Sequence, residues 1–179
     1  MTAYVINLDS RPDRMKQFKE NDLPFPVMRF PGVVAKCGED GCTLSHLSIL
    51  SKQLRNNDFP FIVFEDDCQL IQPWSVVEQA MKQLPPWWDV LYLGATLRKP
   101  LKRYSENLFH LDKAWATHAI IYHSPNIVNY ILENHNTPSG RNLDIFICNT
   151  VQHHFRCFIT YPLVAVQRSG LSNISGQVV

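Results

Sequence analysis

The stretch FPFIVFEDDCQLIQP, residues 59–73, decides how the rest of the chain is interpreted. Residues 61–64 are apolar without interruption, too few for a typical helix and bracketed by prolines, which predicts a strand buried on both faces. Three carboxylates follow directly: Glu65, Asp66 and Asp67. Open parallel sheets place their ligand sites at the carboxyl ends of strands. We therefore expect an α/β fold with a functional site at the end of this strand.

The acidic triplet predicts a metal site. Two carboxylates about 5 Å apart repel by roughly 3 kcal/mol at an effective dielectric near 20, so the cluster needs a counter-charge. A hard divalent cation would supply it. Because side chains alternate along a strand, Glu65 and Asp67 can face one side and Asp66 the other. We expect Glu65 and Asp67 to hold the metal. The alternative is a solvated acidic turn held by a nearby Lys or Arg.

Composition narrows the function classes. The chain has 179 residues, 45% of them hydrophobic and 11% aromatic, which predicts one domain over residues 1–179 with a core of its own. A formal net charge of +1 gives no reason to expect binding to nucleic acid. The N-terminus turns polar at Asn7, and no later apolar run reaches membrane-spanning length. We expect no signal peptide, no transmembrane segment and a cytoplasmic location.

The five cysteines form an odd set without the paired spacing of a metal-binding motif. They predict reduced thiols in the core or in loops. A disulfide between Cys37 and Cys42 is the alternative.

The rest of the chain alternates predicted strands and helices, which favours a mixed, mainly parallel sheet flanked by helices. The expected strands are 4–8, 27–30, 61–64, 89–93, 109–111, 115–122, 157–161 and 164–167. The expected helices are 11–20, a helix from about 43 to 56, 74–84, 124–133 and 142–154. Ser10 and Asp13 resemble a capping box for the first of these helices.

Polar residues near two helix starts are candidates for a nucleotide site. Asn7, Arg11 and Arg14 lie where a strand turns into a helix, which in α/β folds is a habitual nucleotide contact. The alternative for the arginines is a solvated surface. Ser45 and His46 are expected in the first turn of the second helix, facing the sheet edge. The alternative for His46 is a structural role.

Two further features have a functional and a structural interpretation. Asp144 falls in the first turn of the helix 142–154, where it could act as a base or only stabilise the helix dipole by roughly 0.3–1 kcal/mol. The segment LRKPLKRY, residues 97–104, carries four basic residues and is expected to be an exposed loop. Such runs are usually solvated, and contact with a phosphate or an acceptor is the alternative.

Seven blocks occur in order over nearly the whole chain. They are VINLDSRPDRM (5–15), GCTLSHLSIL (41–50), FIVFEDDCQL (61–70), DVLYLGA (89–95), ATHAIIY (116–122), NLDIFI (142–147) and a closing pattern of Pro162, Val166, Gln167, Ser172 and Ile174. The ordered set resembles glycosyltransferase family 25, which includes bacterial lipooligosaccharide galactosyltransferases and procollagen galactosyltransferases. The resemblance implies a GT-A fold, UDP-galactose or UDP-glucose as donor, Mn²⁺ (or Mg²⁺), and inversion at the anomeric carbon.

The resemblance also implies roles for single residues. Donor-binding roles fall on Asn7, Arg11, Arg14, Ser45, His46, Glu65 and Asp66. Glu65 and Asp67 would hold the metal at the diphosphate. An inverting transfer needs a base on the face opposite UDP to take the proton of the acceptor hydroxyl. Asp144 is our first candidate for that base and His118 the second.

The sequence departs from the family pattern in two blocks. Residues 116–120 read Ala-Thr-His-Ala-Ile where the family more usually has Gly-Thr-X-Ala-Tyr, and Asn173 replaces an acidic residue near the closing Ser-X-Ile. The chain is also short for the family.

We therefore expect a metal-dependent inverting glycosyltransferase that moves galactose or glucose from a UDP-sugar to a hydroxyl of a glycan or protein acceptor. One alternative is a catalytically inactive nucleotide-sugar-binding or interaction domain of the same fold. The other is a haloacid-dehalogenase-like phosphatase, which would need an Asp nucleophile where Glu65 stands.

Overall fold

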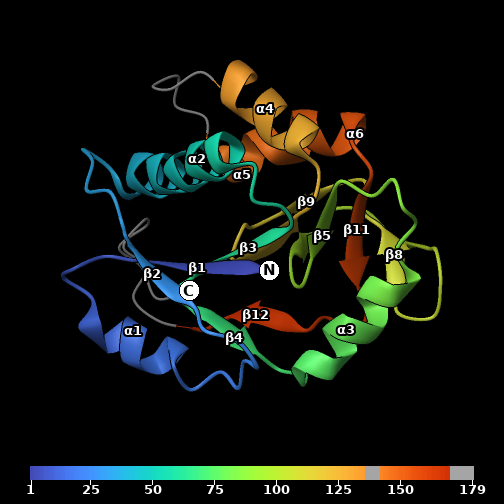
Figure 1. Ribbon diagram of the computed structural model, residues 1–179, viewed down its shortest axis with the longest axis horizontal. Helices are drawn as coiled ribbons and strands as arrows, with labels where there is room; N and C mark the ends of the chain where they lie inside the picture. Colours follow the sequence, from blue (N-terminus) through green and yellow to red (C-terminus); the bar gives the residue numbers. More distant parts are fainter. Residues whose placement is uncertain (136–141, 170–179) are drawn as a thin grey trace.

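A mixed sheet of eight strands forms the centre of the computed structural model, which describes residues 1–135 and 142–169 (Figure 1). Six of the eight strands point the same way, because only β10 and β8 run antiparallel to both of their neighbours. The predicted mixed, mainly parallel α/β fold is thus confirmed. In spatial order the strands are β2 (Met28–Pro31), β1 (Thr2–Asn7), β3 (Phe61–Glu65), β10 (Ala119–Tyr122), β5 (Val90–Tyr92), β11 (Cys157–Thr160), β8 (Leu108–His110) and β7 (Lys102–Arg103).

The predicted strand of residues 61–64 is confirmed as β3, which also includes Glu65. It pairs in parallel with β1 and antiparallel with β10. Phe61 and Val63 enter one hydrophobic cluster, while Ile62 and Phe64 enter the cluster on the other face of the sheet. Because successive side chains of a strand point to opposite faces, an uninterrupted apolar run fits only where both faces are covered.

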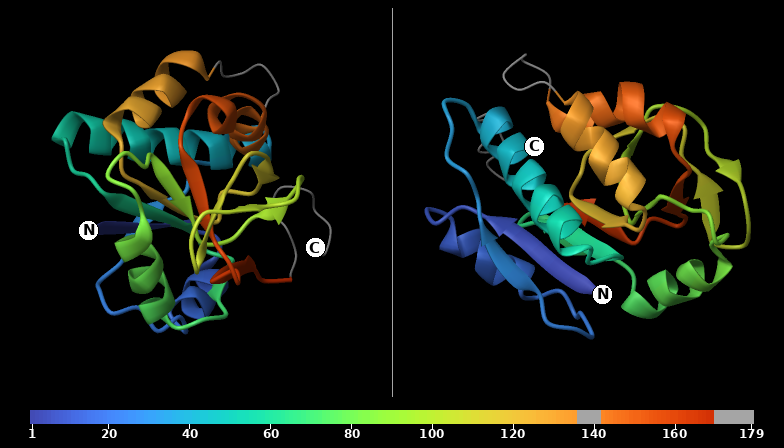
Figure 2. Two further views of the ribbon diagram at one scale, coloured as in Figure 1. Left: turned by 90° about the vertical axis from the view of Figure 1, so that its right-hand side faces the viewer. Right: turned by 45° about the horizontal axis from the view of Figure 1, so that its top comes forward.

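Helices cover both faces of the sheet. On one face lie α2 (Gly38–Asn56), α4 (Pro125–Asn134) and a C-terminal helical segment, and on the other lie α1 (Pro12–Phe18) and α3 (Trp74–Gln83), as Figures 1 and 2 show. The C-terminal segment consists of α5 (Leu143–Phe146), the π-helix η1 (Ile147–Val151) and α6 (Gln152–His154). Two small sheets pair β4 (Cys68–Leu70) with β12 (Ala165–Gln167), and β6 (Thr96–Leu97) with β9 (Ala114–Trp115).

The second helix begins earlier than predicted, so the placement of Ser45 and His46 in its first turn was wrong. α2 starts at Gly38, and the thiol of Cys37 accepts a hydrogen bond from the amide of Asp40 at its N-terminus. Gly41 lies inside this helix. A side chain does not fit there, because a Cβ atom would lie 2.5 Å from the carbonyl oxygen of Val33. The glycine is therefore a site of close backbone approach and not a helix boundary.

Other local predictions had mixed outcomes. The Ser124 cap of α4 is confirmed, since its hydroxyl accepts from the amide of Asn126. The capping box at Ser10 was wrong, because Arg11 occupies the N-cap of α1 without a side-chain cap. The predicted strand 115–122 is divided into β9 and β10, with Ala116 between them at a φ of 76°.

Two further predictions concern the whole chain. All five cysteines are free thiols, so the alternative of a bridge between Cys37 and Cys42 was wrong. Within the described ranges, no helix has both the length and the apolar character that crossing a membrane requires. The closing pattern at Ser172, Asn173 and Ile174 lies outside the described residues.

Candidate functional site

A cavity of about 480 Å³ lies beside the carboxyl ends of β1 and β3. Its wall contains the whole acidic triplet, together with Arg14 and Ser45 from the predicted set. The loop between β2 and α2 and residues 167–169 complete it. The carboxyl ends of neighbouring parallel strands therefore do open onto one concave site, as an α/β fold favours.

Asp66 is held from two elements at once. The amide of Asn7 donates to its Oδ2 atom at 2.7 Å, and Nη1 of Arg14 lies 3.1 Å from its Oδ1 atom. Burial raises the pKa of Asp66, although the hydrogen bond from Asn7 and the charge of Arg14 act in the opposite direction. Asp66 thus joins the ends of β1 and β3 to helix α1.

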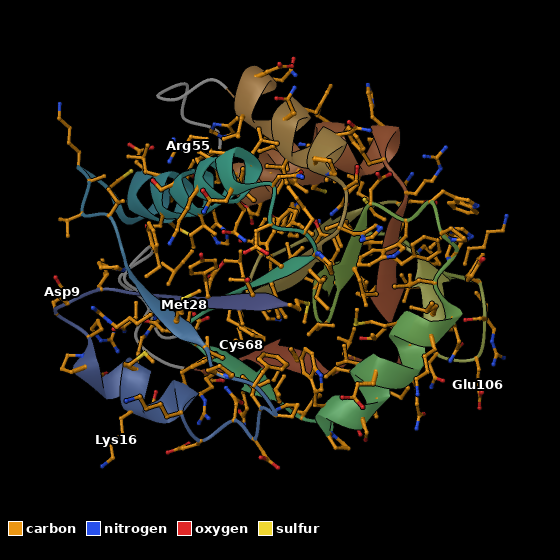
Figure 3. All side chains as sticks on the ribbon, in the orientation of Figure 1. Asp9, Lys16, Met28, Arg55, Cys68 and Glu106 are labelled. Atoms are coloured by element: carbon orange, nitrogen blue, oxygen red, sulfur yellow. The ribbon has the colours of Figure 1, made fainter. Side chains whose placement is uncertain are left out.

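Arg29 orients Asn7 and was missed from the sequence. Its guanidinium donates to Oδ1 of Asn7 at 2.9 Å and to the Asn7 carbonyl at 3.0 Å. It also contacts Asp9. Asp9 lies on the loop between β1 and α1, where Figure 3 labels it. The only signal in the sequence was a basic residue within the predicted strand 27–30. Its partner depends on the pairing of β2 with β1, which sets Arg29 opposite Val5.

Asp67 carries a buried oxygen without a donor. Within residues 1–135 and 142–169 its Oδ1 atom has no hydrogen-bond partner, while Oδ2 lies 3.6 Å from Nη1 of Arg14. Burial, reinforced by the charge of Glu65, raises the pKa of Asp67 to about 7. Asp67 lines the cavity, and its buried polar atom without a partner needs an explanation, which an oxygen-seeking cation would provide.

Glu65 contacts two residues that the sequence did not link to it, Thr117 and His46. Its Oε1 atom accepts a 2.6 Å hydrogen bond from the hydroxyl of Thr117 and lies 3.2 Å from Nε2 of His46. Burial raises the pKa of Glu65, but the interaction with His46 and the hydrogen bond from Thr117 are the main effects that outweigh burial and leave that pKa below its ordinary value. Glu65 is therefore held charged, with one oxygen already occupied.

A second cavity of about 160 Å³ adjoins the first. Asp144 lies on its wall with Thr117, and the two cavities share Cys42, Glu65 and Gln167. Oδ1 of Asp144 accepts a 2.7 Å hydrogen bond from the amide of Ile145, and burial raises the pKa of the Asp144 carboxyl. Two molecules bound side by side would therefore meet at the shared wall.

Asn7 and His46 line neither of the two cavities and contact Asp66 and Glu65 on their walls. Three further predicted site residues lie differently. Arg11 pairs with Asp13 at 2.8 Å and lines neither of these two cavities. Ser45 lines the first cavity, but its hydroxyl donates to the Gly41 carbonyl and accepts from the Val33 amide. The third, His118, is 3% exposed and also lines neither cavity. Burial lowers its pKa.

The described residues offer two places for a cation. One is the predicted pair, Glu65 and Asp67, which both line the first cavity and whose role in holding a metal stays a prediction. The other was not predicted: the ligand atoms of Cys42, His46 and Glu65 all lie within 4.8 Å of one another.

Comparison with known proteins agrees with this architecture. The model of glycosyltransferase family 25 (LPS biosynthesis protein) matches residues 35–137, more than half of the chain. A crystal structure of A197 from STIV is 16% identical, covering 97% of this chain and 91% of that chain with a TM-score of 0.54.

A glycosyltransferase involved in the glycosylation of the major capsid of PBCV-1 is 10% identical. The match covers 88% of this chain and 80% of that chain, with a TM-score of 0.56. At such identities these two structures show a common fold. No curated protein matches the sequence.

Proposed function

The chain belongs to glycosyltransferase family 25, and we propose that it moves a hexose from a UDP-sugar to a hydroxyl group of a glycan or protein acceptor. We propose that residues 1–179 form one domain for this reaction, which depends on a divalent cation and inverts the anomeric carbon. The observation that carries the proposal is the pair of adjoining cavities that share a wall at Glu65. A donor in the larger cavity and an acceptor in the smaller one would place their reacting groups together.

The larger cavity would take the nucleotide diphosphate of the donor. Asp67 would hold a divalent cation such as Mn²⁺ or Mg²⁺ through its unpartnered Oδ1 atom, because such cations prefer oxygen ligands. Glu65, the other predicted ligand, can offer only the oxygen that His46 and Thr117 do not contact. When bound, the cation would neutralise the negative charge that collects on UDP as the sugar leaves.

Asp66 would bind the ribose. A carboxylate has about four acceptor positions, so the contacts to Asn7 and Arg14 leave room for a ribose hydroxyl. Asn7 and Arg14 would then act by holding Asp66 in place, and Arg29 by orienting Asn7. The roles predicted for Asn7 and Arg14 as direct donor contacts remain predictions.

Asp144 would remove the proton of the acceptor hydroxyl. As the O–H bond breaks, the proton passes to the Asp144 carboxylate and the oxygen attacks the anomeric carbon from the face opposite UDP. The bond from that carbon to the diphosphate oxygen breaks, and its electron pair leaves with UDP. Burial raises the pKa of Asp144, which makes it a better base. Its place on the smaller cavity supports Asp144 over the buried His118.

Release of UDP from UDP-galactose or UDP-glucose, with water in place of the unidentified acceptor, tests this proposal. We expect metal-dependent release, strongly reduced in Asp144→Asn while the variant still binds UDP. Metal-dependent UDP binding without any release from either sugar would favour the alternative, a nucleotide-sugar-binding domain without activity.

A further inference from the structure

We infer that Cys42, His46 and Glu65 form a binding site for a soft divalent cation, Zn²⁺ above all, distinct from the hard-cation position at Asp67. The sulfur of Cys42, a ring nitrogen of His46 and a carboxylate oxygen of Glu65 lie within 4.8 Å of one another. Three protein ligands with one open position are the usual composition of a zinc site that also binds a substrate or water. The inference does not depend on sugar transfer.

Rigid elements present the three side chains. Cys42 and His46 are four residues apart on α2, so both project from the same face of one helix. Glu65 ends β3, the central strand buried on both faces. Ligands on regular elements are held more precisely than ligands on loops, which lowers the cost of ordering them around an ion.

The distances are close to those of a coordinated ion. Zinc bonds of about 2.0–2.3 Å in a tetrahedron put neighbouring ligand atoms about 3.3–3.6 Å apart. Nε2 of His46 already lies 3.2 Å from Oε1 of Glu65. The widest pair in the group would have to close by at most about 1.2–1.5 Å to reach tetrahedral spacing. Rotation of the Cys42 side chain can supply such a movement.

The burial of His46 is an independent observation. Its imidazole is completely buried, and Nδ1 has no hydrogen-bond partner in the described part of the chain. The polar contact that this ring makes is therefore the one between Nε2 and Oε1 of Glu65. A cation bound at Nε2 would lie between the ring and the carboxylate of Glu65, where the two groups already face each other at 3.2 Å.

The chemistry of the donors separates this site from Asp67. Thiolate and imidazole ligands favour Zn²⁺ over Mn²⁺ and Mg²⁺, whereas a carboxylate alone favours the harder ions. Thr117, which donates to Oε1 of Glu65, would orient the carboxylate from outside the ligand set. Since Cys42 and Glu65 line both cavities, the open position of the ion would lie at their shared wall.

Titration of the EDTA-treated, reduced protein with Co²⁺ tests the inference, because a thiolate ligand gives Co²⁺ a charge-transfer band in the near ultraviolet. We expect this band to saturate at one equivalent and to disappear when Zn²⁺ is added. Cys42→Ala should abolish it, and Thr117→Val should weaken Co²⁺ binding by about 10-fold or more.

Two control variants make the result specific. Cys37→Ala removes the exposed thiol at the N-cap of the same helix and should leave the band intact. Asp67→Asn should also retain it, which separates this site from the proposed donor site. If the native protein shows no thiolate band, if the band survives in Cys42→Ala, or if it is lost in Asp67→Asn, the inference is wrong.

Discussion

The side-chain amide of Asn7, at the end of β1, donates a 2.7 Å hydrogen bond to Oδ2 of Asp66, directly after β3. Both residues are buried, and 59 positions separate them in the sequence. The contact fixes the carboxylate that follows the central strand to the end of the neighbouring parallel strand.

Replacing Asn7 should therefore lower the stability of the protein, because the hydrogen bond to Asp66 is lost. Asn7→Ala leaves a buried carboxylate oxygen without a donor, and we expect a loss of about 1–3 kcal/mol in the free energy of unfolding. Chemical denaturation would measure it. Asn149→Ala, the same change at an exposed position in η1, should cost less than about 0.5 kcal/mol. Equal effects of the two variants would contradict the role of the hydrogen bond.

Ala116 is expected to carry backbone strain. Its φ of 76° lies in the left-handed region, which is unfavourable for a residue with a Cβ atom. Ala116→Gly should raise the free energy of unfolding by about 1 kcal/mol. The same substitution within helix α3, Ala80→Gly, should lower it by about that amount or more, because glycine is a poor helix former. A loss of stability in Ala116→Gly would show that this backbone is not strained.

Asp58 gives the fold a measurable pH dependence outside the cavities. Hydrogen bonds from Thr2 and Gln53 lower the pKa of Asp58, so the charged form is preferred in the folded state. The stabilisation is present above the ordinary pKa of an aspartate and is lost as the pH falls through the lowered value. Thr2→Val should be less stable than the native protein at pH 7, and this difference should shrink in acid.

Urea denaturation at neutral and acid pH would measure that difference. Thr2→Ser keeps the hydroxyl and serves as the control. A Thr2→Val deficit of the same size at both pH values would contradict the account.

Asp144 should govern the rate and not the binding of the donor. Loss of a general base typically costs a factor of about 10²–10⁴, so Asp144→Asn should slow UDP release from the sugar nucleotide by at least about 100-fold. Glu39→Gln changes another carboxylate of the same cavity and should cost less than about tenfold. Calorimetry should give similar affinities for UDP in both variants. A base elsewhere is indicated if Asp144→Asn keeps the native rate.

Local patterns predicted the parts of the fold that depend on neighbours in the sequence. The apolar run 61–64 and its acidic end identified β3 and the edge where the cavity lies, because burial on both faces leaves no polar position in a strand. The start of α4 at Ser124 and Pro125 was also predicted, because a helix cap depends only on residues a few positions away in the sequence.

Contacts across the sheet could not be predicted in this way. Thr117 reaches Glu65 over 52 positions, and Arg29 reaches Asn7 over 22. Both contacts depend on which strands pair and in what register, and no local pattern encodes that. Gly41 was predicted to precede the helix, because the sequence does not show what requires a glycine there. The requirement comes from the carbonyl of Val33, in a loop that packs on the helix.

The central claim is that the larger cavity binds a nucleotide diphosphate together with a cation at Asp67. Calorimetric titration of UDP into the protein, with Mn²⁺ and then with EDTA, tests it most directly when repeated on Asp67→Ala and on the exposed control Asp22→Asn. The account predicts binding that needs Mn²⁺, disappears in Asp67→Ala and is unchanged in Asp22→Asn. Binding of UDP that is equally strong in EDTA or in Asp67→Ala, or no binding under any condition, would contradict it.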